Sequence, residues 1–162
     1  MIISLGLGAN LGQPLRTLER ARAELASILD QSRISSIYLT TPYDKTDQPL
    51  YYNQVITGTT TVVPHELLLC LKGIEAWLGR RPRTHWGPRE IDIDILMIDG
   101  VVLNEGPVLL PHPRIQERDF VLAPLAELHP TGKHPTLDVS WRDLLARIPA
   151  SQRTIIKTIK QE

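Results

Sequence analysis

Asp92 and Asp94 are the residues whose type and spacing most clearly suggest chemistry in this chain. They lie in residues 91–95, where isoleucine and aspartate alternate with the period of two that is typical of a half-buried strand. In such a strand both carboxylates project from one side, about 7 Å apart at the backbone for a rise of about 3.3 Å per residue. They could share one hard cation or hold two, with water and phosphate oxygens as further ligands. The spacing favours a magnesium site, although a merely solvent-facing acidic strand would have the same pattern.

Just before this strand the chain is rich in arginine, at Arg80, Arg81, Arg83 and Arg89. A guanidinium group can bind two phosphate oxygens at once, whereas lysine, which is absent from residues 80–94, acts as a point charge. Prolines and a glycine interrupt the segment, so we expect a long loop. Because solvated loops seldom carry a tryptophan, we interpret this loop, with Trp86, as a lid over a metal-bound polyphosphate. An ordinary charged loop is the alternative.

Length and composition indicate the class of protein. The chain has 162 residues, enough for one domain over residues 1–162, and we expect residues 153–162 to fray. Its 18 basic and 18 acidic residues give a net charge of zero, which argues against nucleic acid or an anionic membrane as a partner. The sequence lacks a signal-peptide pattern and a long apolar run, so we expect a cytoplasmic protein. A monomer is the expected oligomeric state. Cys70 lies in an apolar run, where a buried, inert thiol is expected.

The order of the predicted elements indicates a fold. Apolar patterns and turn residues predict strands at residues 2–7, 32–41, 51–63 and 91–98, and helices at residues 14–29 and 64–78. An Asp-Gly turn at residues 99–100 predicts an added hairpin strand at residues 101–103. The β-α-β-β-α-β order is that of a ferredoxin-like α+β fold, a mainly antiparallel sheet with helices packed on one face.

The last third contains a further candidate for phosphate binding. His112 lies between two prolines and close to Arg114 and Arg118, so it could donate a hydrogen bond to a phosphate group. A lone histidine is nevertheless more often a structural residue. Short helices are expected at residues 124–128 and 141–148.

Several motifs together resemble a known family. They are the string HWGPREIDIDIL at residues 85–96, PHPR at residues 111–114 with Arg118 and Phe120, and the shorter segments at residues 8–12, 47–53, 74–75 and 78–80. The chain thereby resembles the 6-hydroxymethyl-7,8-dihydropterin pyrophosphokinases of folate biosynthesis over nearly its whole length.

The resemblance implies Mg²⁺-dependent transfer of pyrophosphate from ATP to 6-hydroxymethyl-7,8-dihydropterin, with release of AMP. It implies that Asp92 and Asp94 hold two Mg²⁺ ions and, with Arg80 and Arg89, form the catalytic set. The residues that it implies for ATP binding are Glu75, Arg80, Arg89, His112 and Arg118. Those that it implies for the pterin are Thr40, Pro42, Tyr43, Tyr51, Asn53, Trp86 and Phe120.

Two departures from the family pattern affect the loop. Family members commonly carry arginines at the positions of Pro82 and His85; Arg81 and Arg83 are the candidates to replace the first. No general base is evident.

Two other classes of protein fit parts of the pattern. A two-metal nucleotidyltransferase would also use paired aspartates and arginines, but its substrate would attack the α-phosphorus of ATP. A ferredoxin-like nucleic-acid-binding module would use the arginines as a backbone clamp and Trp86 for base stacking, but the zero net charge argues against it.

Overall fold

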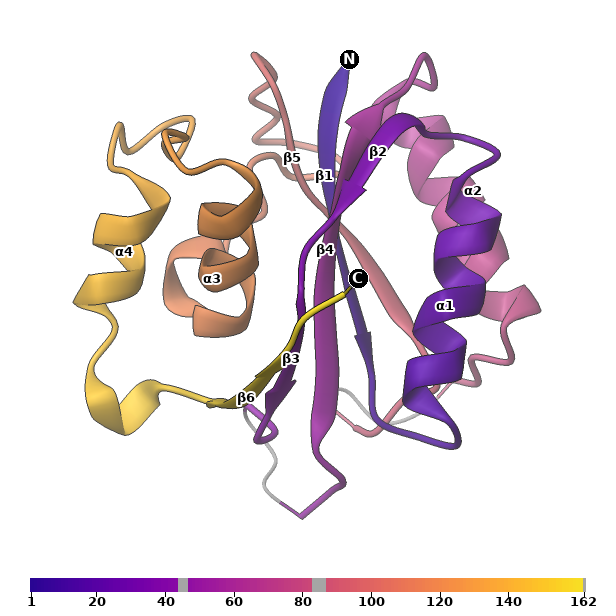
Figure 1. Cartoon of the computed structure of the whole chain (residues 1–162). Coiled ribbons are helices and arrows are strands. Elements are labelled where there is room, and N and C mark those ends of the chain that lie inside the picture. The colour runs from indigo at the N-terminus through magenta and orange to yellow at the C-terminus, as the bar shows by residue number, and fades with distance from the viewer. Residues whose placement is uncertain (44–46, 83–86, 162) are drawn as a thin grey trace.

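The central element of the fold is an antiparallel sheet, shown in Figure 1. A computed structural model describes residues 1–43, 47–82 and 87–161. Within these residues the strands are β1 (Ile2–Ala9), β2 (Asp30–Ile34), β3 (Ile37–Thr40), β4 (Tyr51–Thr59), β5 (Asp92–Ile98) and β6 (Ile155–Ile159). They lie in the order β5-β1-β4-β3-β6, with β2 also paired to β4, and each pairing is antiparallel. The crossover helices are α1 (Pro14–Leu25) and α2 (Pro64–Trp77). The predicted α+β fold with a β-α-β-β-α-β core is confirmed.

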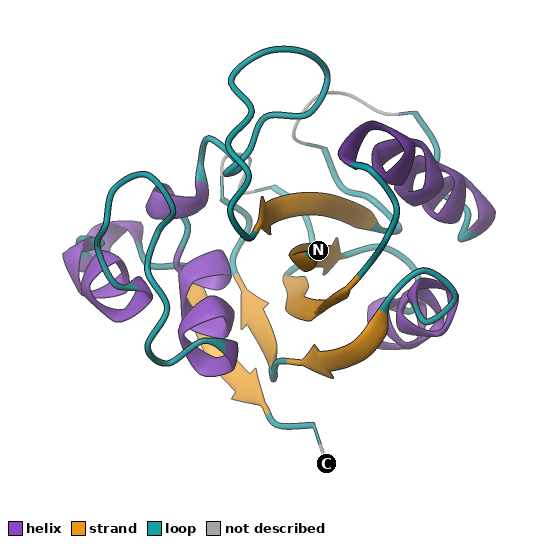
Figure 2. Cartoon of the chain, turned by 90° about the horizontal axis from the view of Figure 1, so that it is seen from above, coloured by secondary structure: helices purple, strands orange, loops and turns teal. Residues whose placement is uncertain are grey.

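Helices cover both faces of the sheet, so the expectation of helices on one face was wrong. Figures 1 and 2 show α1 and α2 on one side and α3 (Asp119–Leu128) on the other, with α4 (Trp141–Arg147) packed against α3. Two 3-10 turns, at Ile115–Glu117 and Ala150–Gln152, flank these later helices. Neighbouring residues of β4 enter separate apolar cores, since Ile56 packs under α1 and α2 and Val55 packs under α3. Because the strand carries apolar residues on both sides, the second face needs a cover of its own.

The alternation in β5 places the two aspartates. Ile93 and Ile95 are buried in the core beneath α1 and α2, so Asp92 and Asp94 project from the opposite face, toward α3. The register with β1 shifts after Asp94, between Ile95 and Met97, which leaves Leu96 as an extra residue. The predicted strand and its one-sided pair of carboxylates are confirmed.

Three expected elements differ in detail. The strand expected over residues 32–41 is divided into β2 and β3, because the Ser35 hydroxyl accepts a hydrogen bond from the backbone N–H of Val55, at 3.0 Å, and interrupts the ladder. The turn at Asp99 and Gly100 is present, with a φ of 71° at the glycine, but isolated bridges follow it in place of the expected added strand. Residues 153–162 were expected to fray, whereas Ile155–Ile159 forms β6 and pairs with β3.

Cys70 is exposed, so the expectation of a buried thiol was wrong. The buried residues of α2 are Leu67, Leu71 and Glu75, four residues apart on one face of the helix. Cys70 precedes Leu71 by about 100° of rotation and lies outside that face. In the described part of the chain, no helix is long and apolar enough to cross a membrane.

Candidate active site

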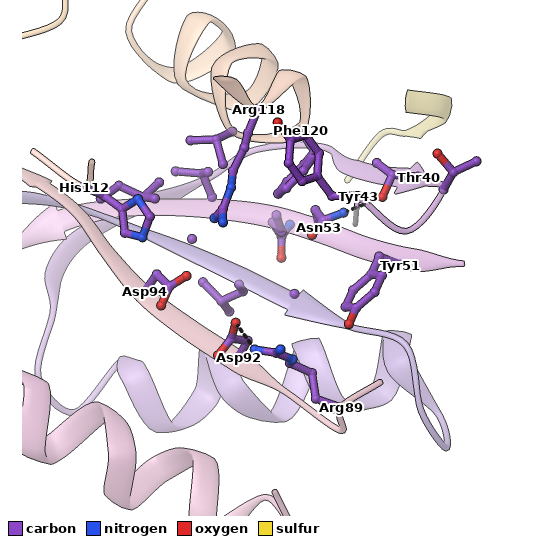
Figure 3. A pocket seen from close by; sticks show the side chains of 18 of the residues that line it. Thr40, Tyr43, Tyr51, Asn53, Arg89, Asp92, Asp94, His112, Arg118 and Phe120 are labelled. Carbon is purple, nitrogen blue, oxygen red and sulfur yellow. Dashed lines mark hydrogen bonds and ion pairs between the residues drawn. The ribbon is translucent and has the colours of Figure 1, made fainter. Parts of the chain in front are cut away.

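A cavity of about 450 Å³ lies on the face of the sheet that α3 covers. Its floor is formed by β1, β4 and β5, and its rim by the end of β3 and the start of α3 (Figure 3). Most of the residues that the sequence marked line this cavity: Thr40, Tyr43, Tyr51, Asn53, Arg80, Arg89, Asp92, Asp94, His112, Arg118 and Phe120. Residues from β3 to α3, up to 80 positions apart, are thereby brought to one place.

Two marked residues do not line the cavity, and others cannot be placed. Pro42 is buried in the segment next to Tyr43, and Glu75 is buried behind the wall formed by β5. Trp86, His85 and Arg83 lie outside the described residues, and so does the middle of the proposed lid.

Asp92 is held by two arginines. Its Oδ1 accepts a hydrogen bond from Arg80 at 2.5 Å, and its Oδ2 accepts one from Arg89 at 2.7 Å. The charge of this carboxylate is therefore compensated by guanidinium groups that approach from the two ends of the basic segment. Figure 3 shows Arg89 reaching Asp92 from the N-terminal end of β5.

Asp94 is in a different environment, although it is only two residues away. Within the described residues it makes no hydrogen bond and no ion pair. Burial, and then the charge of Asp92, raise the pKa of Asp94 from 3.8 to about 6, while Lys72 and Arg118 act in the opposite direction. No group of three or more possible His, Cys, Asp or Glu metal ligands occurs in the described residues. A pair of carboxylates with one unpaired member suits a hard cation that takes its other ligands from water and phosphate.

Glu75 organises the cationic wall from behind. Its side chain is 2% exposed. It accepts hydrogen bonds from Lys72, at 3.0 Å, and from the backbone N–H of Ile93, at 2.7 Å, and pairs with Arg80 at 2.6 Å. Glu75 therefore fixes Arg80 and β5, and its implied role in ATP binding stays a prediction.

Asn10 fixes Arg89 through the main chain. Its Oδ1 accepts a hydrogen bond from Arg89 N at 2.8 Å, and its Nδ2 donates to Gln48 Oε1 and to the carbonyl of Pro49, each at 3.1 Å. In addition, the N–H groups of Asn10 and Leu11 donate to the carbonyl of Arg89. These bonds join three loops at the side of the cavity that carries Asp92.

His112 and Arg118 form the side of the cavity nearest Asp94 (Figure 3). Burial, followed by the positive charges of Arg118 and Arg114, lowers the pKa of His112 from 6.5 to about 4, so the imidazole is neutral near pH 7. Its Nδ1 accepts a hydrogen bond from Arg114 N at 3.2 Å, which assigns the proton to Nε2. His112 can therefore donate one hydrogen bond to an anion without carrying a charge.

The other half of the cavity, called the uncharged half below, is lined by neutral and partly aromatic side chains, and the Arg118 guanidinium borders it, 5.8 Å from the centre of the Phe120 ring. Asn53 Nδ2 donates to Thr40 Oγ1 at 2.9 Å, which orients the amide. A side chain at Gly8 would press on this amide, because a Cβ built there lies 3.0 Å from Asn53 Oδ1. The rings of Tyr43 and Phe120 meet edge to face, with centroids 6.1 Å apart. This half offers oriented hydrogen-bonding groups and an aromatic ring to a flat, polar-edged molecule.

Several polar residues at the site were not identified from the sequence, among them Lys72, Gln48 and Asn10. Lys72 and Gln48 line the cavity, and Asn10 lies behind it. Lys72 could have been found from the helical repeat, since it lies one turn before Glu75 on α2. For Gln48 the position depends on a bond to Asn10, a contact between residues 38 positions apart that no local pattern reveals.

An antiparallel α+β domain with paired aspartates and arginines beside an aromatic recess suits an enzyme that transfers a group from a polyphosphate. Residues 4–130 match the sequence profile of the 7,8-dihydro-6-hydroxymethylpterin-pyrophosphokinase family. Because this match covers most of the chain, the protein belongs to that family. Its relatives are named as pyrophosphokinases, and it is an enzyme of this kind.

Individual relatives agree with this assignment. The chain is 38% identical over 133 residues to 2-amino-4-hydroxy-6-hydroxymethyldihydropteridine pyrophosphokinase from Aquifex aeolicus, covering 82% of this chain and 83% of the relative. It is 41% identical over 128 residues to the protein of the same name from Methylorubrum extorquens, covering 78% and 81%. It is also 38% identical over 143 residues to the mitochondrial folate synthesis bifunctional protein of Arabidopsis thaliana, covering 88% of this chain but 26% of that protein.

Solved structures confirm the fold. A crystal structure of HPPK-DHPS in complex with substrates superimposes with a TM-score of 0.67 at 16% identity, over 90% of this chain and 43% of that one. Plasmodium falciparum HPPK-DHPS with pteroate gives a TM-score of 0.71 at 17% identity, over 90% and 42%. The chain therefore corresponds to less than half of these larger proteins.

Proposed function

We propose that the protein transfers the pyrophosphoryl group of ATP to the hydroxymethyl oxygen of 6-hydroxymethyl-7,8-dihydropterin, with Mg²⁺ as the metal. The observation that carries this proposal is the juxtaposition, in one cavity, of a charged half around Asp92 and Asp94 and an uncharged half around Asn53 and Phe120. The first half suits a metal-bound triphosphate, and the second suits a flat heterocycle.

Asp92 and Asp94 are the residues that would hold Mg²⁺ in this reaction. When bound, the metal would neutralise charge on the phosphate oxygens and help to align them. Arg80 and Arg89 are bonded to Asp92 at present, and metal bound to this carboxylate would release their guanidinium groups toward phosphate. His112 would add a neutral N–H donor, and Arg118 a cation, on the opposite side.

Asn53 and Phe120 would position the pterin. The amide of Asn53 has both a donor and an acceptor, so it can distinguish the polar rim of a pterin from that of another flat ring. Phe120 would stack on the ring, while Tyr51 lies between the two halves of the cavity, with its hydroxyl 3.2 Å from the carbonyl of Gly87. Thr40 and Tyr43 would complete this side.

The reaction itself requires positioning and charge neutralisation more than covalent chemistry. A bond forms between the hydroxymethyl oxygen and the β-phosphorus, the bond from that phosphorus to the α-β bridging oxygen breaks, and AMP leaves. The hydroxyl proton passes to solvent in the overall balance. Arginines released from Asp92 and a neutral histidine would stabilise the charge that develops on the transferred group.

Incubation of the protein with ATP, Mg²⁺ and the hydroxymethyl pterin, followed by analysis of the products, tests the proposal. We expect AMP and the pterin diphosphate in equal amounts. Release of free pyrophosphate with a nucleotidyl-linked acceptor would instead show attack at the α-phosphorus and identify a nucleotidyltransferase. Salt-sensitive RNA binding without any turnover would favour the nucleic-acid-binding class.

A further inference from the structure

Asp119 is a buried carboxylate that lies between two residues of the site, Arg118 and Phe120. Its exposed fraction is 2%, and it begins α3. Its oxygens accept hydrogen bonds from Thr154 N at 2.6 Å, from Thr154 Oγ1 at 2.5 Å, from Ile155 N at 3.0 Å and from Phe120 N at 2.9 Å. Three of these four donors belong to the C-terminal segment, so the carboxylate ties that segment to the start of α3.

Thr154 makes a second connection, to the opposite wall of the cavity. Its carbonyl accepts a hydrogen bond from Thr41 N at 3.0 Å. Thr41 and Thr40 line the cavity, and Thr40 lies opposite Ile155 in the pairing of β3 with β6. A single residue of the C-terminal segment thus joins the wall that carries Phe120 to the wall formed by the end of β3.

We propose that Asp119 and Thr154 are positioning residues that set the width of the pterin half of the cavity. The inference rests on the proposed function, because it assumes that a pterin lies between Phe120 and the end of β3. The match to the family profile ends at residue 130, so family membership assigns no role to Thr154.

The physical basis is the cost of removing one of the four donors that a buried carboxylate accepts from. Asp119 is almost fully desolvated, and the Thr154 hydroxyl is one of the donors that compensate it. When that donor is lost, the backbone N–H groups of Thr154 and Ile155 still join Asp119 to the C-terminal segment, but the start of α3 shifts to satisfy the freed oxygen, and Phe120 moves with its neighbour. A ring that is misplaced by a fraction of an ångström binds a flat ligand less well, while the metal half of the cavity, built on β5, keeps its geometry.

Glu127 provides a matched control at the other end of α3. Its carboxylate accepts hydrogen bonds from Ser36 N, at 2.9 Å, from Ser36 Oγ, at 3.0 Å, and from Tyr38 OH, at 2.8 Å. It therefore also joins α3 to the β3 region through three donors, but neither Glu127 nor its partners line the cavity.

The experiment compares Thr154→Val, Thr154→Ser and Glu127→Gln in the full chain, with KM and kcat measured separately for each substrate. We expect Thr154→Val to raise KM for the pterin about tenfold and to leave KM for MgATP unchanged. Thr154→Ser keeps the hydroxyl, so its KM for the pterin should stay near that of the wild-type protein. Glu127→Gln should lower the melting temperature without changing KM for the pterin. The positioning role would be overturned if Thr154→Val and Glu127→Gln changed KM for the pterin equally. It would also be overturned if Thr154→Val changed KM for the pterin and KM for MgATP equally.

Amide hydrogen exchange of the unmodified protein gives an independent measurement if Thr154→Val does not fold. Addition of the hydroxymethyl pterin should slow exchange in residues 154–159 as well as at residues 118–120. Slower exchange at residues 118–120 without slower exchange at residues 154–159 would overturn the inference. A wild-type protein that forms no pterin diphosphate would contradict the proposed function, whereas an active protein whose KM for the pterin does not respond to Thr154→Val would contradict this inference alone.

Discussion

The two halves of the cavity are held together by different kinds of interaction. In the uncharged half, neutral hydrogen bonds such as that from Asn53 to Thr40 fix the side chains in place. In the charged half, Asp92 is occupied by Arg80 and Arg89, and Asp94 has no partner among the described residues. In the proposed reaction, a pterin would therefore enter a preformed recess, whereas a metal-bound triphosphate would exchange ion pairs within the protein for new ones.

This difference suggests where the stability of the fold and the activity conflict. Neutral hydrogen bonds around Asn53 stabilise both the folded protein and its complex. An unpaired, partly buried carboxylate such as Asp94 destabilises the folded protein and has value only when a cation binds. Substitutions in the two halves should therefore separate binding of the two substrates, and the most severe effect should come from the charged half.

Replacement of Asp94 by alanine should have the largest effect. We expect turnover to fall by about 10³-fold or more, because a metal bound as proposed would lose one of its two protein ligands. The fold should be retained, since Asp94 makes no hydrogen bond or ion pair within the described residues. Steady-state kinetics and circular dichroism measure the two properties. Near-normal turnover would remove Asp94 from the site.

Replacement of Asn53 by alanine should weaken mainly the binding of the pterin in the uncharged half of the cavity. We expect pterin affinity to fall about 10- to 100-fold, the effect of removing hydrogen bonds worth about 1–3 kcal/mol, while MgATP affinity stays within about twofold. Calorimetric titration with each ligand measures the separation. Thr40→Val, which removes only the partner of the amide, is the control and should have a smaller effect. A loss of MgATP affinity comparable to that of the pterin would contradict the division into halves.

The pKa of Asp94 distinguishes the two aspartates directly. Burial and the charge of Asp92 raise this pKa to about 6 in the metal-free protein. Carbon-13 NMR of the side-chain carboxyl should therefore show a titration with its midpoint near pH 6, and a bound metal should lower the midpoint because it stabilises the ionised form. A midpoint near the ordinary value of 3.8 would show that the carboxylate is well solvated.

A gain in stability is the smallest expected effect. The folded-state pKa of Asp94 lies above its unfolded value, so ionisation destabilises the folded protein increasingly between about pH 4 and pH 6, and fully above that range. Asp94→Asn removes this penalty, and we expect it to raise the melting temperature of the metal-free protein by a few degrees at pH 8 and by less at pH 5. Thermal denaturation at both pH values measures the difference. A lower melting temperature at pH 8 would show that the carboxylate stabilises the fold.

The sequence was most informative where the pattern was local. Alternation in β5 predicted that Asp92 and Asp94 share one face, because burying Ile93 and Ile95 leaves the aspartates no other direction. The order of helices and strands likewise predicted the core topology. Both depend on neighbours along the chain or on elements that follow one another.

The sequence did not predict the contacts between distant segments. Residues 153–162 were expected to fray because they offer few apolar anchors, but Ile155–Ile159 forms β6, which is ordered by pairing with β3 and by the bonds from Thr154 and Ile155 to Asp119. Glu75 was assigned to ATP binding by resemblance, but its hydrogen bond to Ile93 N depends on how α2 packs on β5. The roles implied for the site residues remain predictions, and those of Trp86, His85 and Arg83 concern residues outside the described part of the chain.

A crystal structure with Mg²⁺, a non-hydrolysable ATP analogue and 6-hydroxymethylpterin would test most directly whether one cavity binds both substrates. We expect oxygens of Asp92 and Asp94 about 2.0–2.1 Å from Mg²⁺ that also contacts the phosphates. Arg80 and Arg89 should have moved from Asp92 to phosphate oxygens, and the pterin should lie against Phe120 with its rim hydrogen-bonded to Asn53. A triphosphate bound away from the two aspartates, or a pterin outside the recess formed by Asn53 and Phe120, would contradict the proposed function.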